Sequence, residues 1–159
     1  WQSEIFVMQS SLVGIDGYIH FEYVIPRMGK RVDVLLVIEN IIFIIEFKVG
    51  SDAYDANSIT QLVDYTLDLK NFHEGSHNQI ICPILIATEA QETNFTINME
   101  EDDILEPILS NGENAHCTLK PKEWWNEKIF IHNQKQVYTS SIYDYGKGQR
   151  LQMIFEKNK

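Results

Sequence analysis

The chain has 159 residues, of which 44% are hydrophobic, and this is enough for one domain with a buried core. Its formal net charge of −10 argues against a free-standing protein that grips nucleic acid over a broad surface. No apolar run approaches the roughly 18 residues of a membrane span, and the polar, mixed start is not typical of a signal peptide.

We therefore expect a single domain over 1–159 with no membrane association. Because the chain starts at Trp1 and not at a methionine, we also expect it to be a piece of a longer protein. Cys82 and Cys117 have no partner at metal-finger spacing, so they predict neither a disulfide framework nor a zinc site. A reducing, cytoplasmic setting is the corresponding expectation.

Hydrophobic spacing predicts the secondary structure of the first two thirds of the chain. In chain order, the expected elements are a helix over 2–13, a strand over 18–25, a hairpin of strands over 32–38 and 41–45, a helix over 56–73, a buried strand over 80–88 and a short edge strand over 104–109. Asp55 or Asn57 would cap the long helix. Further on, the pattern predicts a loop over 110–119, a short helix over 121–128 with Trp124 and Trp125, and a hairpin over 129–137.

Charged residues interrupt the predicted hairpin at its open end. Asp33 lies inside the first apolar run, and Glu46 and Lys48 end the second run, two residues apart and thus on one face of a strand. A carboxylate buried by an apolar sheet is costly unless a positive charge compensates it. Two acids and a lysine that converge on one spot would suit a divalent cation. Each residue taken alone could equally be a paired carboxylate or ordinary alternation at a strand end.

The long helix connects this hairpin to the buried strand. A strand, a helix and a second buried strand in this order predict a right-handed crossover with parallel pairing. Gln61 comes early in the helix and Tyr65 follows one turn later on the same face. Gln61 could instead satisfy backbone groups at the helix start, and Tyr65 could be a core residue.

Taken together, Asp33, then Glu46-Phe47-Lys48, then Gln61-Leu62-Val63-Asp64-Tyr65 resemble the PD-(D/E)XK nuclease superfamily. The last element is similar to the QxxxY motif of the branch that contains type I restriction motor subunits and bacterial recombination helicase-nucleases. The run from Ile25 to Thr88 also resembles the N-terminal module of bacterial P-loop ATPases or helicases. The resemblance implies an α/β fold with a restriction-endonuclease-like three-layer core, in which helices flank a mixed central sheet. Val32 takes the position before Asp33 at which the family usually has a proline, and this difference does not remove a metal ligand.

The resemblance also implies a site and its chemistry. Mg²⁺ or Mn²⁺ would be held by Asp33, Glu46 and the backbone carbonyl of Phe47, with Lys48 and Gln61 as further catalytic residues. The additional acid that the family takes from its first helix would be Glu4, and Glu22 competes for the same role. The expected nucleic-acid contacts are Arg27, Lys30, Arg31 and Tyr65. The three bases could also be solvated charges of a turn.

Three functions are compatible with these residues. The first is a metal-dependent nuclease that hydrolyses phosphodiester bonds, most simply in DNA, attached to an ATPase or helicase domain in DNA processing or defence. The second is a catalytically silent nuclease-fold module that binds nucleic acid or regulates its neighbour. The third is a protein-interaction domain, which the acidic charge favours. The presence of Asp33, Glu46 and Lys48 favours the first function, because a module that no longer cleaves would usually have lost Glu46 or Lys48.

Overall fold

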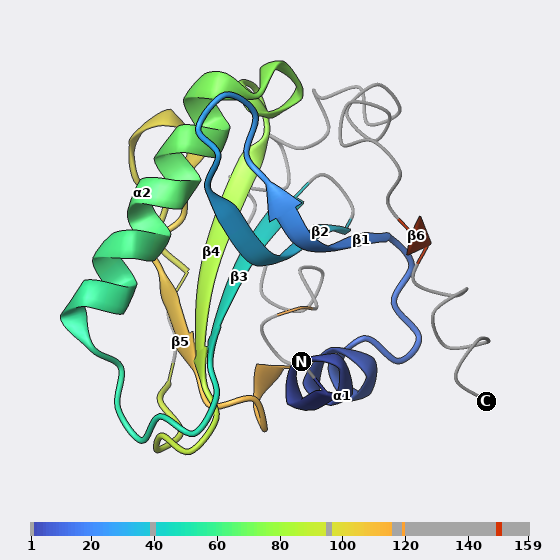
Figure 1. Cartoon of the computed structure of the whole chain (residues 1–159), viewed down its shortest axis with the longest axis vertical. Helices are drawn as coiled ribbons and strands as arrows, with labels where there is room; N and C mark the ends of the chain where they lie inside the picture. The colour runs from blue at the N-terminus through green and yellow to red at the C-terminus, as the bar shows by residue number, and fades with distance from the viewer. Residues whose placement is uncertain (1, 39–40, 95–96, 116–118, 120–148, 151–159) are drawn as a thin grey trace.

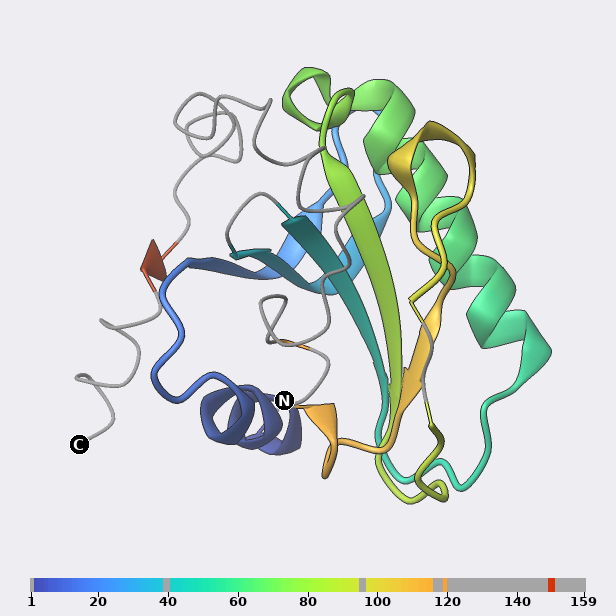
Figure 2. The ribbon, with the colours of Figure 1, turned by 180° about the vertical axis from the view of Figure 1, so that it is seen from behind.

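A mixed sheet with a helix on each face forms the centre of the molecule (Figures 1 and 2). The computed structural model describes residues 2–38, 41–94, 97–115, 119 and 149–150. The elements are α1 (Gln2–Ser11), β1 (Tyr18–Val24), β2 (Arg31–Ile38), β3 (Ile41–Lys48), α2 (Ala56–Phe72), η1 (Glu74–Ser76), β4 (Ile80–Ala87), η2 (Glu101–Asp103), β5 (Ile108–Ser110) and β6 (Gln149–Arg150). The strand order is β5-β4-β3-β2-β1-β6.

The sheet changes from antiparallel to parallel at β3. Strands β1, β2 and β3 pair antiparallel, whereas β4 pairs parallel with both β3 and β5. Helix α2 is the crossover between β3 and β4, and such a connection is what parallel neighbours require. This order of one helix, three antiparallel strands, a crossover helix and a parallel strand is the restriction-endonuclease-like order implied above. The predicted α/β class and mixed sheet are therefore confirmed.

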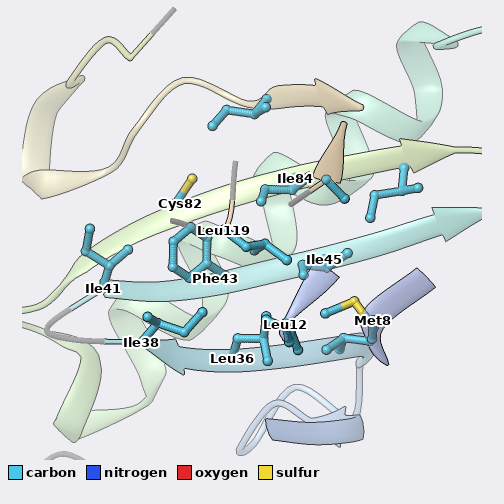
Figure 3. Close-up of a cluster of buried hydrophobic side chains, with 14 of the residues drawn as sticks. Met8, Leu12, Leu36, Ile38, Ile41, Phe43, Ile45, Cys82, Ile84 and Leu119 are labelled. Carbon is cyan, nitrogen blue, oxygen red and sulfur yellow. The ribbon is translucent and has the colours of Figure 1, made fainter. Parts of the chain in front are cut away.

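Two hydrophobic clusters, one on each face, fix the helices to the sheet. Met8 and Leu12, from α1 and the residue after it, pack with Phe43 and Ile45 of β3 on one face, as Figure 3 shows. On the other face, Leu62 and Leu69 of α2 pack against a second set of strand residues. Strands β3 and β4 are buried along almost their whole length, which explains why both appear in the sequence as continuous apolar runs.

Asp55, one of the two residues predicted to cap the long helix, is the N-cap of α2. Its carboxylate accepts hydrogen bonds from the backbone N–H of Ser58 at 2.8 Å and from the Ser58 hydroxyl at 2.6 Å. These bonds satisfy a backbone donor that has no partner within the first turn of the helix. The N-terminus of α2 is thus held at a defined place after β3.

The structure corrects the predicted edge strand. In place of a strand over 104–109, residues Ile104 and Leu105 form only isolated bridges, and β5 begins at Ile108. Pro83 lies in β4 between the Ile81–Ile104 bridge and the first β4–β5 pair at Ile84. A proline has no N–H to donate, and here it lies between the paired positions along this edge of β4.

Several predicted features lie outside the described residues. They are the Glu39-Asn40 turn, Cys117, the helix over 121–128 with Trp124 and Trp125, and the hairpin over 129–137. Cys82 is described and is fully buried in β4, where burial raises the pKa of its thiol. Across the described ranges, no helix combines the length and the hydrophobicity that crossing a bilayer would take.

Candidate functional site

The candidate site lies where β2 and β3 stop pairing. The register of the two strands ends at Val34–Ile45, one residue before Asp33 and Glu46 would face each other. There the Oδ2 atom of Asp33 accepts a hydrogen bond from the backbone N–H of Phe47 at 2.8 Å. A side-chain carboxylate therefore takes the place of a ladder carbonyl, and this bond fixes the orientation of Asp33 beside Glu46.

Glu46 is the most perturbed acid near this point. Its residue is only 6% exposed, and burial raises the pKa of its carboxyl group from the usual 4.5 to about 8. Burial is the largest cause of this rise, to which a hydrogen bond to the Asp33 carboxyl group and the negative charge of Asp33 also contribute, while the charge of Lys48 opposes it. Two carboxyl groups that lie close together in a buried environment cannot both ionise easily, because their negative charges repel each other. At neutral pH the pair retains a proton, unless a cation replaces it.

Lys48 ends β3 on the same face as Glu46 and is half-buried. Its positive charge lowers the pKa of Glu46. The pKa of Asp55 is lowered mainly by its hydrogen bonds from Ser58 and to a smaller extent by the charge of Lys48. The following turn is attached to the end of β4. Thr88 donates its backbone N–H to the carbonyl of Lys48 at 3.3 Å, and its Oγ1 accepts from the N–H of Gly50 at 2.8 Å. These bonds fix the place where the lysine leaves the sheet.

Both candidates for the additional acid lie near Asp33. Glu4, on α1, has its pKa raised by burial and then by the negative charges of Asp33 and Glu22. Glu22 lies in β1 between the Phe21–Val34 and Tyr23–Val32 pairs, directly across from Asp33. The structure thus brings both acids towards Asp33, and the choice between them stays open.

At Glu22 and Asp33, the regular alternation of side chains between the two faces of the sheet is interrupted in β1 and β2. Phe21 and Val34 pack with the α1-side cluster, whereas the next pair, Tyr23 and Val32, packs with the α2-side cluster. In regular strands, residues two apart share a face. Glu22 accounts for the change because it has a φ of +51°, a left-handed conformation that costs a non-glycine residue about 1 kcal/mol. Strained residues of this kind cluster at functional sites.

The three basic residues among the predicted nucleic-acid contacts lie in the turn between β1 and β2 and at the first residue of β2, whereas Tyr65 lies in α2. Arg27 is exposed and has a φ of +66°. Lys30 donates from Nζ to Oδ2 of Asp68 at 2.7 Å, and its Nζ lies 5.8 Å from the centre of the Tyr65 ring. Arg31 pairs with Glu22 through Nη1 and Oε2 at 3.3 Å. Two of the three predicted phosphate contacts are thus paired with acids of this chain.

Gln61 does not reach towards the acids in this structure. Its Nε2 donates to the hydroxyl of Tyr65 at 2.5 Å, so the two predicted residues of α2 are joined to each other. The sequence analysis missed Asp68, which follows Tyr65 by three residues and so shares its helix face. Its spacing from Tyr65 was visible in the sequence, but its pairing with Lys30, 38 residues away, was not.

The candidate metal ligands at the point where β2 and β3 stop pairing would suit Mg²⁺ or Mn²⁺. Asp33, Glu46 and the Phe47 carbonyl provide oxygen atoms only, which hard cations prefer, and Mg²⁺ usually keeps several of its waters. In the part of the chain that the structure describes, no group of three or more His, Cys, Asp and Glu side chains is arranged to hold a metal. An ion at this point would be held by the carboxylates of Asp33 and Glu46 and the carbonyl of Phe47, with water completing its coordination.

No family model matches the chain, and no curated protein matches it. Among solved structures, it is similar to the small subunit of the heterodimeric restriction endonuclease R.BspD6I, with a TM-score of 0.42 and 11% sequence identity. That match covers 98% of this chain and 87% of the other. A likeness of this degree carries no functional argument, so function must be argued from the residues of this chain.

Proposed function

We propose that this chain is a metal-dependent nuclease domain that hydrolyses phosphodiester bonds of nucleic acid, most simply DNA. The observation that carries the proposal is the Asp33–Glu46 pair, a buried carboxyl group held beside a second one where two strands separate, with Lys48 on the same face. Perturbed acids with a specific charged partner are typical of functional sites.

Each residue has a role that follows from its position. Asp33, oriented by the Phe47 N–H, and Glu46 would hold Mg²⁺ or Mn²⁺ together with the Phe47 carbonyl. When bound, such an ion supplies an attacking water of lowered pKa and compensates charge on the phosphate. Lys48 would orient that water or stabilise the negative charge that develops on the phosphoryl oxygens. Glu4 or Glu22 would add a carboxylate from the other side of Asp33.

The cleavage test uses the purified chain, plasmid and short-duplex DNA, and millimolar Mg²⁺. Asp33→Ala, Glu46→Ala and Lys48→Ala should each lower the rate about a hundredfold or more, because each removes a group that acts on the reacting phosphate. Glu74→Gln removes an exposed charge from η1 and should leave the rate unchanged. Cleavage that persists in Glu46→Ala would refute the assignment.

A second candidate is a catalytically silent module that binds nucleic acid. The pairing of Lys30 with Asp68 and of Arg31 with Glu22 favours the absence of cleavage, because it leaves fewer free bases to hold a scissile phosphate near Asp33 and Glu46. It predicts that the unaltered chain binds DNA but cleaves no faster than Glu46→Ala. An ATPase or helicase domain, in the same chain or a partner, is part of the first proposal. A GxxxxGK[ST] segment downstream in the full-length protein would support that attachment.

A further inference from the structure

The turn between β1 and β2 is attached to α2 through Lys30. In Figure 1 this turn rises beside the C-terminal half of α2. The ammonium of Lys30 donates to Asp68 at 2.7 Å and faces the Tyr65 ring at 5.8 Å. The hydroxyl of that ring in turn accepts from Gln61. One lysine thus links the turn that precedes Asp33 to two successive turns of the crossover helix.

The exposures of the two partners differ in a way that matters for binding. The Lys30 side chain is 40% exposed, whereas that of Asp68 is 16% exposed. An incoming anion can therefore approach Lys30 from solvent while Asp68 stays packed against the structure. The hydrogen bond to Asp68, followed by the charges of Asp68 and Asp64, raises the pKa of Lys30, so the lysine keeps its charge for either partner.

The exchange of one anion for another at Lys30 is energetically accessible. An ion pair that is open to solvent changes an equilibrium constant about fivefold at most. A phosphate of a nucleic acid gains in addition from counterion release, which strengthens binding strongly at low salt. Asp68 can therefore weaken phosphate binding at Lys30 without preventing it.

We propose that Asp68 is an internal competitor for nucleic-acid phosphate at Lys30, and that it sets the affinity and salt dependence of binding beside the Asp33–Glu46 pair. The inference rests on the proposed function, because it needs the turn to face a phosphate backbone. Asp68 is a positioning residue in this scheme. It touches Lys30 and not the substrate.

The experiment measures binding of a short fluorescent DNA duplex in EDTA, so that no cleavage occurs, over a range of NaCl concentrations. Asp68→Asn should bind about two- to fivefold more tightly at low salt. Its slope of log K against log salt should be steeper than that of the unaltered chain, because Lys30 is then free to bind phosphate. Lys30→Gln should weaken binding and make the slope shallower, and the two slope changes should add up to about 0.9, the value for one phosphate contact.

Two further variants separate this mechanism from simple charge removal. Glu74→Gln also removes one negative charge but lies outside the Lys30 pair, and its slope should equal that of the unaltered chain. In the double variant Asp68→Asn/Lys30→Gln, the gain should disappear, because it depends on the freed lysine. A gain that survives without Lys30, or an equal gain in Glu74→Gln, overturns the proposal.

The result is distinguishable from failure of the nuclease proposal. Binding that depends on Lys30 and Asp68 in EDTA, together with no Mg²⁺-dependent cleavage, refutes the nuclease and leaves this inference standing. Cleavage that Glu46→Ala abolishes, together with unchanged binding and slope in Lys30→Gln, refutes this inference alone. Lys30→Gln also provides a test that does not require the Asp68 variant to fold.

Discussion

Glu46→Gln should make the fold more stable at neutral pH when no divalent cation is present. Glutamine keeps the size of the side chain and resembles the protonated acid, so it removes the cost of ionisation without opening a cavity. The expected gain follows from the pKa of Glu46, which is about 8 in the folded chain against an ordinary value of 4.5.

The sign and size of the effect follow from proton linkage. Between pH 4.5 and 8 the unfolded chain has lost the Glu46 proton while the folded chain keeps it, so the free energy of unfolding falls as pH rises through this window. At about 1.4 kcal/mol per pH unit, the loss reaches about 3 kcal/mol at pH 7 and about 5 kcal/mol above pH 8. The variant should lack this loss. The two chains should therefore be equally stable near pH 4 and differ by about 3 kcal/mol at pH 7.

The assay is urea unfolding in EDTA at several pH values between 4 and 8.5, with Glu89→Gln as the matched control. Glu89 is an exposed acid just after β4, and its replacement should leave the pH profile as it is. The reasoning is refuted if Glu46→Gln shows the same fall in unfolding free energy between pH 4.5 and 8 as the unaltered chain.

Two more predictions concern the metal and the packing. Millimolar Mg²⁺ or Mn²⁺ should raise the melting temperature by binding the folded state, and Asp33→Asn should remove the rise; an unchanged melting curve of the unaltered chain would count against a preformed site. Gly17→Ala should lower the free energy of unfolding by about 3 kcal/mol, because its Cβ would lie 2.4 Å from the carbonyl oxygen of Val37. Gly50→Ala meets open space at a φ of +79° and should cost only about 1 kcal/mol; equal losses at the two glycines would contradict the packing argument.

Much of the architecture was predictable because it depends on local patterns. The apolar runs of β3 and β4 are long, and that of β2 continues without a break after Asp33; their burial forces them into a sheet covered on both faces. The helix between β3 and β4 dictated their parallel pairing. The edge strand was misplaced because Ile104 forms only an isolated bridge and continuous pairing begins beyond Pro107, at Ile108, and no periodicity in a segment this short shows where continuous pairing starts.

The sequence by itself determined the fold class, the hairpin of β2 and β3, the parallel pairing of β3 with β4 and the presence of two acids and a lysine at the open end of that hairpin, since these depend on residue type and spacing. Only the tertiary structure decided that Asp33 accepts the Phe47 N–H, that Glu4 and Glu22 both lie near Asp33, and that Asp68 pairs with Lys30. Such contacts depend on strand register and on where a helix crosses a sheet. Packing of the whole chain sets both, and residues that are far apart in sequence meet as a result.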